Sequence, residues 1–383
     1  MREIGVYLHI PFCVRKCAYC DFLSFPSGEE LKKIYASALI REIRGYEEAV
    51  GDCVVTSVFM GGGTPSVMPV RQLRDIFSAL YDSFRIAPDA EITMEMNPGT
   101  VDEGILSLVF DYVNRVSLGV QSANDSELKA LGRIHSFRDA EKSVELLRLG
   151  GVTNLNIDLM TGIPEQTVSS LTETLEKVVA LRPEHLSVYS LIVEEGTEFA
   201  RMQKAGQLHL PDEETEREMY ELTGDVLGRA GYRRYEFSNY AQEGCRCRHN
   251  IRYWKRGEYL GLGLGAASLF RDSRWRNTGN LDDYLAHSAD PGSLVCDMEH
   301  LERKAQIEEY MFLGLRMTDG IRRQEFEQTF GLVLDDIYGD VLRKHIGDGL
   351  MEEPEPGTFR LTGRGVEISN RVLSDYLLDS PSS

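Results

Sequence analysis

The first half of the chain alternates between short apolar, β-branched runs and longer stretches with the hydrophobic spacing of amphipathic helices. A short apolar run between turn residues predicts a buried strand, and apolar residues three and four apart predict a helix. Strands are expected at Gly5–Ile10, Val54–Met60, Glu91–Glu95, Arg115–Val120, Asn154–Leu159 and His185–Leu191. Helices are expected between them at Glu29–Glu48, Pro69–Ser83, Asp102–Tyr112, Ala140–Leu149 and Ser169–Leu181.

Strands that alternate with helices in this way predict a parallel sheet covered by helices. An open doubly wound sheet and a curved partial barrel both fit this order. Polar residues stand where the strands end: Gly61-Gly62-Gly63-Thr64-Pro65, Glu95, Gln121, Asp158 and Tyr189. Functional groups at the carboxyl ends of parallel strands are typical of active sites in α/β folds. The sequence therefore predicts a site at this edge of the sheet.

The pattern changes after Gly196. A charged helix is expected at Asp212–Arg229 and a strand around Tyr232–Phe237, followed by a segment rich in Cys, His and aromatic residues, Cys245–Trp254. From about His300 we expect the helices and strand of a small module that resembles a winged helix, at Leu301–Leu315, Arg322–Phe330, Asp335–Gly347 and Thr358–Leu361. These changes divide the chain into a core of residues 1–195, an extension of residues 196–295 and a helical module of residues 296–383. The tail Asp379–Ser383 is expected to fray.

Composition and charge narrow the class of protein. The chain has 383 residues, which is too many for one small core, and its formal net charge is −19. No run of Lys or Arg offsets this charge, so we expect neither a nucleic acid nor an anionic membrane as partner. No apolar run is long enough to cross a bilayer, and the first residues lack the pattern of a signal peptide. A cytoplasmic protein with no integral membrane segment is expected.

Three of the seven cysteines fall within eight residues, at Cys13, Cys17 and Cys20, directly after the first expected strand. Iron–sulfur clusters are bound by thiolates, and a cubane cluster has four irons. Three cysteines can therefore hold three corners and leave one iron open to a small molecule. A zinc knuckle and a set of unliganded thiols are the alternatives. Zinc normally takes four ligands in paired short spacings, so the spacing favours the cluster.

Several motifs in order give the chain a wider resemblance. They are Tyr7-Leu8-His9-Ile10-Pro11-Phe12-Cys13, Gly61-Gly62-Gly63-Thr64-Pro65, Glu95-x-Asn97-Pro98, Arg115-x-Ser117-x-Gly119-x-Gln121-Ser122, Gly132-Arg133-x-His135 and Asn156-x-Asp158. Together they resemble the radical S-adenosylmethionine superfamily. More narrowly, they resemble its branch of oxygen-independent coproporphyrinogen III dehydrogenases and HemW-type heme chaperones. The resemblance implies an α/β fold: a partial (β/α)6 TIM-like barrel with a C-terminal α+β extension and the small helical module.

The resemblance also implies roles for the matching residues. A [4Fe–4S] cluster would be ligated by Cys13, Cys17 and Cys20, and S-adenosylmethionine would chelate the fourth iron through its amino and carboxylate groups. The amino-acid end of that cofactor would lie against Gly62, Gly63 and Thr64.

Further matching residues would complete the cofactor shell. Glu95 would accept a hydrogen bond from the ammonium or a ribose hydroxyl, with Gln121 beside it. Arg133 is suited to the carboxylate and Asp158 to the ribose. The cluster loop would be flanked by Tyr7 and Tyr19.

Two features separate the branches of this family. The dehydrogenase branch carries a fourth cysteine two positions after the third and a long N-terminal extension. This chain has Phe22 at that position, and only six residues precede Tyr7. Both departures point away from coproporphyrinogen oxidation.

A positive match to the heme-chaperone branch lies at His249-Asn250-x-x-Tyr253-Trp254. Neutral imidazole is an axial ligand of heme iron, and aromatic rings cover a flat macrocycle. His249 is the candidate heme ligand, with Tyr253 and Trp254 as walls. The alternative is a hydrogen-bonded structural turn at His249 with Trp254 in the core.

The leading hypothesis is a heme chaperone that binds heme and transfers it to an acceptor hemoprotein, using the [4Fe–4S] cluster and S-adenosylmethionine. The alternative is an oxygen-independent coproporphyrinogen III dehydrogenase, which decarboxylates propionate side chains by radical chemistry that the cofactor supplies.

Overall fold

The computed structural model describes residues 1–378, so the expectation for Asp379–Ser383 lies outside the described residues. Six strands run parallel and side by side in the order of the sequence. They are β1 (Arg2–Ile10), β4 (Cys53–Gly62), β5 (Ile86–Met96), β6 (Arg115–Gln121), β7 (Leu155–Thr161) and β8 (His185–Ser190). These strands confirm the six predicted ones. β5 begins five residues before the predicted Glu91, and the other ends shift by up to three residues.

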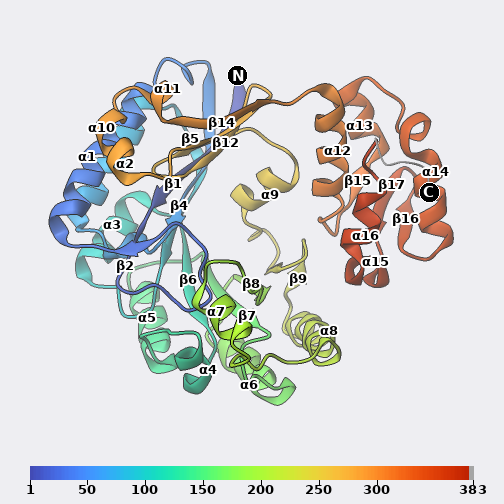
Figure 1. Ribbon diagram of the computed structural model, residues 1–383, viewed down its shortest axis with the longest axis horizontal. Coiled ribbons are helices and arrows are strands. Elements are labelled where there is room, and N and C mark those ends of the chain that lie inside the picture. Colours follow the sequence, from blue (N-terminus) through green and yellow to red (C-terminus); the bar gives the residue numbers. More distant parts are fainter. Residues whose placement is uncertain (379–383) are drawn as a thin grey trace.

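Further strands extend this sheet on both sides to twelve strands. Beyond β1 lie β11 (Tyr259–Leu262), β12 (Ala267–Phe270), β13 (Ser273–Asn277) and β14 (Val295–His300). Beyond β8 lie β10 (Asn239–Ala241) and β9 (Arg233–Arg234). The edge strands β14 and β9 do not pair with each other, and the sheet curves into a partial barrel (Figure 1). The partial barrel is thus confirmed over the doubly wound sheet.

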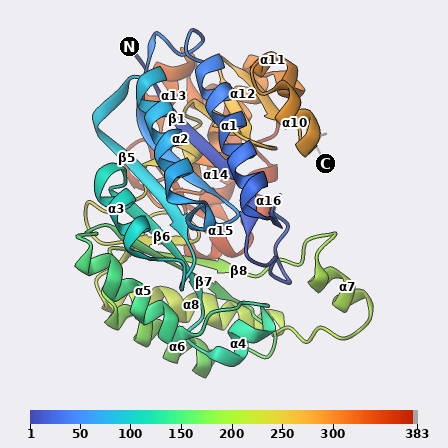
Figure 2. The ribbon, with the colours of Figure 1, turned by 90° about the vertical axis from the view of Figure 1, so that its left-hand side faces the viewer.

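Helices cover the outer face of the curved sheet (Figure 2). They are α1 (Glu29–Gly45), α2 (Val70–Ser83), α3 (Glu103–Tyr112), α4 (Asp125–Ala130), α5 (Phe137–Leu149) and α6 (Val168–Ala180). Outward-facing strand residues such as Met94, Leu118 and Ile157 are fully buried against these helices. This contact forms the main hydrophobic core. Beyond β8 the chain continues through α7 (Glu198–Lys204) and α8 (Glu213–Arg229), and α10 (Leu281–His287) and α11 (Pro291–Leu294) precede β14.

The inner face of the barrel is polar, in contrast to the outer face. Alternate residues of a strand point to opposite faces, so every second position of β5 to β8 points inward. The buried inward residues include Glu91, Thr93, Arg115, Ser117, Asn156, His185 and Ser187. Some of them are joined by hydrogen bonds: Asn156 Oδ1 lies 2.6 Å from His185 Nδ1, and His185 Nε2 lies 2.9 Å from the hydroxyl of Tyr235.

One predicted strand is wrong in its extent. Of Tyr232–Phe237, only Arg233–Arg234 forms a strand, β9. The chain then leaves the sheet because it pairs with a different partner: Glu236 forms an isolated bridge with Met317, and the Thr318 N–H donates to the carbonyl oxygen of Tyr235 over 3.0 Å. This segment therefore ties the barrel to the C-terminal module.

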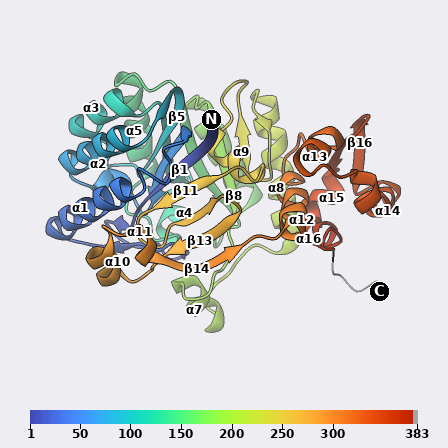
Figure 3. The same ribbon diagram turned by 90° about the horizontal axis from the view of Figure 1, so that it is seen from above.

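The C-terminal module lies beside the barrel, next to α8 and α9 (Arg248–Trp254) (Figure 3). It contains α12 (Arg303–Gly314), α13 (Arg323–Phe330), α14 (Leu334–Gly347), α15 (Gly363–Glu367) and α16 (Ser369–Ser374). A three-stranded antiparallel sheet of β15 (Ile321–Arg322), β17 (Thr358–Leu361) and β16 (Met351–Glu355) forms the wing. The module has its own core cluster, which begins at Ile307. The division at residues 195 and 295 stays a prediction, since β14 still pairs with the large sheet.

Within residues 1–378 no helix combines the length and apolar character needed to cross a membrane.

A buried carboxylate, Glu42 of α1, holds the strands beyond β1 against that helix. It accepts hydrogen bonds from Gly263 N over 2.8 Å, Asn277 Nδ2 over 2.6 Å and the Tyr284 hydroxyl over 2.7 Å. Burial nevertheless raises its pKa from 4.5 to about 7, because taking the charge out of water outweighs these donors.

This pKa gives the stability of the protein a pH dependence. Between pH 4.5 and about 7 the folded state binds the Glu42 proton more tightly than the unfolded state. The contribution of Glu42 to the free energy of unfolding therefore falls as pH rises through this window, and it levels off above about 7. We expect urea denaturation at several pH values to show that the free energy of unfolding falls less steeply with pH in Glu42→Gln than in the wild type. Equal slopes would contradict it.

Candidate functional site

The loop that carries the three cysteines is closed by a small parallel pair of strands, β2 (Phe12–Cys13) and β3 (Phe25–Pro26). The side chains of Cys13, Cys17 and Cys20 line one cleft of about 390 Å³ at the carboxyl ends of the barrel strands. The Thr64 hydroxyl donates to Cys13 Sγ over 3.7 Å, and the Cys20 N–H donates to the Cys17 carbonyl oxygen over 3.3 Å. The loop is thus folded so that all three thiols face the same space.

The arrangement of the thiols separates the cluster from the zinc alternative. Among the described residues, no three His, Cys, Asp or Glu side chains converge to hold a single metal ion. Ligands of one zinc ion meet at one point, whereas ligands of a cubane cluster bind different irons and stand further apart. Three thiols spread around one cleft therefore fit an iron–sulfur cluster better than a zinc knuckle.

Two glycines at the end of β4, Gly62 and Gly63, allow the cleft to form. Gly62 has a φ of +105°, and a Cβ on it would strike the ring of His9. A Cβ on Gly63 would lie 2.6 Å from the Phe12 oxygen and 2.8 Å from the Ile10 oxygen, because the Gly63 N–H donates to Ile10 over 2.8 Å. The two glycines line the cleft, but their backbone also packs directly on the start of the cluster loop. Glycine is needed here because the backbone of the cysteine loop leaves no room for a side chain, a reason that the sequence did not show.

Two half-buried carboxylates, Glu95 and Asp158, face the cleft from β5 and β7. Glu95 Oε2 accepts from the Gly62 N–H over 3.0 Å, and Asp158 accepts from Asn156 Nδ2 over 2.7 Å and from the Ser117 hydroxyl over 3.0 Å. Burial and the neighbouring Asp158 raise the pKa of Glu95 to about 8. Burial also raises the pKa of Asp158. Such carboxylates would gain from hydrogen-bond donors on a ligand.

Arg133, which follows α4, also lines the cleft. Its Nη1 donates to Asn97 Oδ1 over 2.9 Å and its Nη2 to the Tyr19 hydroxyl over 2.8 Å. Its Nε is buried and has no hydrogen-bond partner. A guanidinium held on two sides, with its Nε–H and the second N–H of each Nη still unpaired, is suited to a carboxylate. Tyr19 thus lines the cleft and orients Arg133.

Gln121 ends β6 in a conformation that side chains rarely adopt, with a φ of +71°. It lines the cleft together with Thr64. Strained backbone of this kind is held by its surroundings and is concentrated at functional sites. The backbone at Gln121 therefore departs from regular strand geometry at the point where the residue lines the cleft.

Tyr7 does not line the cleft. Its hydroxyl lies 3.0 Å from His9 Nδ1, and His9 Nε2 lies 2.9 Å from the Leu23 carbonyl oxygen in the cluster loop. Any effect of Tyr7 on the loop therefore passes through His9. This buried histidine thus supports the loop from behind.

Helix α9 is held against the inside of the barrel by its first residues (Figure 1). Glu91 accepts from the Arg248 N–H over 2.9 Å and from the His249 N–H over 3.0 Å. Carboxylates at a helix N-terminus satisfy free N–H groups and stabilise the helix dipole. Glu91 thus fixes the position of α9.

His249 itself is 1 % exposed. Its Nδ1 lies 3.0 Å from the Ser57 hydroxyl and its Nε2 2.8 Å from the Tyr253 hydroxyl, and burial lowers its pKa to about 3. The imidazole is neutral, as a heme ligand must be, but both ring nitrogens are engaged. The role of His249 as heme ligand stays a prediction, and such a ligand would have to give up one of these hydrogen bonds.

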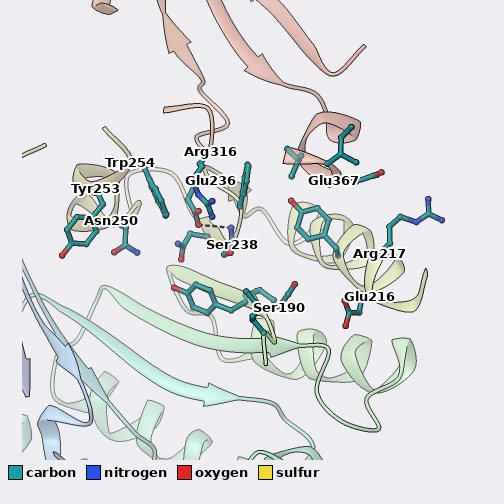
Figure 4. A pocket seen from close by; sticks show the side chains of 18 of the residues that line it. Ser190, Glu216, Arg217, Glu236, Ser238, Asn250, Tyr253, Trp254, Arg316 and Glu367 are labelled. Atoms are coloured by element: carbon teal, nitrogen blue, oxygen red, sulfur yellow. Dashed lines mark hydrogen bonds between the residues drawn. The ribbon is translucent and has the colours of Figure 1, made fainter. Parts of the chain in front are cut away.

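A second cavity of about 820 Å³ adjoins the cleft, between the end of β8, α8, α9 and α15 (Figure 4). Tyr253 and Trp254, the predicted heme walls, line it, whereas His249 does not. Tyr189, Ser190 and Ile192 line both this cavity and the cleft. The remaining wall includes residues that the sequence gave no reason to select, among them Tyr220, Phe237 and Arg316. They come from separate elements and follow no motif.

Comparisons with known proteins agree with this geometry. Residues 7–178 match the Radical SAM superfamily, and residues 301–368 match the HemN C-terminal domain. The heme chaperone HemW of Lactococcus lactis is 36% identical to this chain over 98% of the chain and 97% of the relative. The heme chaperone HemW of Escherichia coli is 32% identical over 99% of each.

A solved structure, that of coproporphyrinogen III oxidase (HemN) from Escherichia coli, has the same fold. Its TM-score is 0.86 with 24% sequence identity, and the match covers 98% of this chain and 90% of that one. The HemW relatives are similar to this chain from end to end, and two different family models match its barrel and its C-terminal module. The chain therefore belongs to the HemW family of the radical S-adenosylmethionine superfamily.

Proposed function

We propose that this protein is a heme chaperone that binds heme and transfers it to an acceptor hemoprotein, with a [4Fe–4S] cluster and S-adenosylmethionine in its cleft. The observation that carries the proposal is the pair of adjoining cavities. One is lined by three thiols and polar strand ends, and the other is larger and partly aromatic. The names of the relatives in Lactococcus lactis and Escherichia coli support the same function.

In the cleft, Cys13, Cys17 and Cys20 would ligate three irons of the cluster. When bound, the cluster supplies an electron and an iron with an open coordination position. Arg133 would bind the cofactor carboxylate through N–H groups that Asn97 and Tyr19 leave unpaired, since those two residues accept only one bond from each Nη and hold the guanidinium in place. Asp158 would accept from the ribose. The chain's own contribution is to orient the cofactor and to keep water away from it.

Phe22 supports the chaperone over the dehydrogenase. It stands at the position of the fourth cysteine of that branch, lines the cleft, and is 62% exposed. The four cysteines outside the triplet, Cys53, Cys245, Cys247 and Cys296, do not line the cleft. The cleft of the described chain therefore offers three thiolates and no fourth.

Two measurements test the proposal on anaerobically reconstituted full-length protein. Incubation with coproporphyrinogen III, S-adenosylmethionine and a reductant should give no protoporphyrinogen above a cluster-free control. Titration with heme, followed by its Soret absorption, should saturate, and the loaded protein should pass heme to an apo-hemoprotein. Turnover of coproporphyrinogen III would favour the dehydrogenase, and failure to bind heme would overturn the chaperone proposal.

A further inference from the structure

The cavity beside the cleft combines flat apolar walls with one unusual cation. Phe237 and Trp254 are aromatic, and Ile192, Val366 and Ile368 add aliphatic surface. Ile192 is 67% exposed and Ile368 39% exposed, which is costly for side chains without a partner in a folded protein. Ligand sites are typically concave and mostly apolar with a few placed polar groups. The cavity fits a flat apolar molecule that covers these side chains.

Arg316 is the cation at this wall. Its guanidinium carbon lies 4.6 Å from the ring centre of Phe237 and 4.7 Å from that of Trp254. Stacking on two rings fixes the plane of the guanidinium group. Figure 4 shows Arg316 between Trp254 on α9 and the segment that carries Glu236 and Ser238. Arg316 is therefore rigid and pre-oriented at the cavity.

The hydrogen-bonding capacity of Arg316 is incompletely used. Its Nε is buried and has no hydrogen-bond partner. The acidic group that acts on it is Glu236, but an oxygen of that carboxylate is already occupied by the Ser238 N–H over 2.9 Å. The Arg316 side chain is partly buried, and a cation that is partly withdrawn from water without a bonded counter-ion is destabilising. A carboxylate on a ligand would relieve that cost.

The charges around the cavity give the ligand a direction. The carboxylates Glu216 and Glu367 lie toward α8 and α15, away from Arg316 (Figure 4). A carboxylate on the ligand would be repelled at that end. Glu236 also lines the cavity beside Arg316, but it is only 1% exposed, so Arg316 is the charge that a ligand carboxylate would meet there. Heme is a flat apolar macrocycle with two propionates at one edge, so its shape and its charge both match this arrangement.

We infer that heme occupies this cavity, with its macrocycle against Phe237 and Trp254 and a propionate paired with Arg316. The inference rests on the proposed function and adds to it the place where heme binds. His249 lies outside the cavity and hydrogen-bonds to Tyr253, which lines it. His249 therefore acts as a positioning residue for the wall that α9 supplies.

The test compares heme with heme dimethyl ester, whose propionates carry no charge. Wild-type protein should bind heme more tightly than the ester, and Arg316→Gln should weaken heme binding about tenfold while it leaves ester binding nearly unchanged. Arg316→Lys keeps the charge and should retain part of the preference. Arg217→Gln is the matched control, because Arg217 lines the same cavity but is exposed and points away from it (Figure 4).

The outcomes separate the two proposals. If wild-type protein binds neither compound, the proposed function fails. If it binds heme and Arg316→Gln keeps the full preference for heme over the ester, only the location of heme is overturned. The same holds if Arg217→Gln loses as much of the preference as Arg316→Gln. Thermal unfolding of each apo variant shows whether the fold is retained, and if Arg316→Gln is unfolded the comparison is decided by Arg316→Lys.

Discussion

Cys17→Ser protein, reconstituted anaerobically with iron and sulfide, will retain less than about a tenth of the wild-type cluster. The three thiols line one cleft, and no other cysteine of the described chain lines it, so no other thiolate can replace the lost ligand. Arg133 acts electrostatically on Cys17 and favours its thiolate, against the burial that raises its pKa. Serine in that place offers a much harder and more basic oxygen. Iron and sulfide content and the visible absorption of the cluster measure the loss.

The matched control for this variant is Cys296→Ser. Cys296 is a partly buried thiol in β14, at an edge of the sheet, and it does not line the cleft. Its replacement should leave the cluster content at the wild-type level. A Cys17→Ser protein with a full and stable cluster would show that another ligand serves that corner, and the assignment of the triplet would be wrong.

Gly63→Ala should damage the fold and the cleft together. The added methyl group would lie 2.6 to 2.8 Å from three backbone atoms of Ile10 and Phe12, and hydrogen-bonded backbone at the end of β1 and in β2 cannot move aside as a side chain can. We expect a loss of about 1–3 kcal/mol in the free energy of unfolding, as for other overpacked sites. Because Phe12 precedes Cys13 directly, cluster content should fall as well. Urea denaturation and iron content report the two effects.

Gly28→Ala controls for the change of glycine to alanine itself. Gly28 precedes α1 with a φ of −78°, and a Cβ there would meet nothing within 4 Å. Its free energy of unfolding should stay within about 0.5 kcal/mol of the wild type. If Gly63→Ala behaved like Gly28→Ala, the close approach of the glycine segment to the cluster loop would not be the reason for the glycine.

The order of strands and helices in the core could be predicted because each element carries its own hydrophobic pattern. The predicted strand Thr358–Leu361 in the C-terminal module agrees in full with β17. Other parts had no such local signal. Residues of β5 before Glu91 include Pro88 and Asp89, which are typical of a turn, yet Ile86 pairs with Val55 through an irregular register. The antiparallel strands β12 to β14 form by pairing onto the edge strand β11, a long-range contact that a local hydrophobic pattern does not predict.

The cleft could be predicted from the sequence and the second cavity could not, for a physical reason. Parallel strands bring their carboxyl ends to one edge whatever their distance along the chain, so motifs at strand ends meet. The second cavity is built differently: Tyr220 lies on α8, Phe237 lies in the irregular segment between β9 and β10, and Arg316 follows α12. Their meeting depends on how the C-terminal module packs on the barrel, and no local pattern encodes that. His249 shows the same limit, since its sequence neighbours gave no sign of the Ser57 contact.

The polar inner face of the barrel has a consequence for how the protein tolerates change. In an ordinary core, exchanging one apolar residue for another of similar size is mild, and introducing polarity is severe. Inside this barrel the severe changes will be the apolar ones: Asn156→Leu would leave His185 and Asp158 with unmet hydrogen bonds in a buried space. In a saturation scan of the chain, inward strand positions should therefore tolerate polar residues better and outward positions should tolerate apolar residues better. The two preferences should alternate with a period of two residues along β5 to β8.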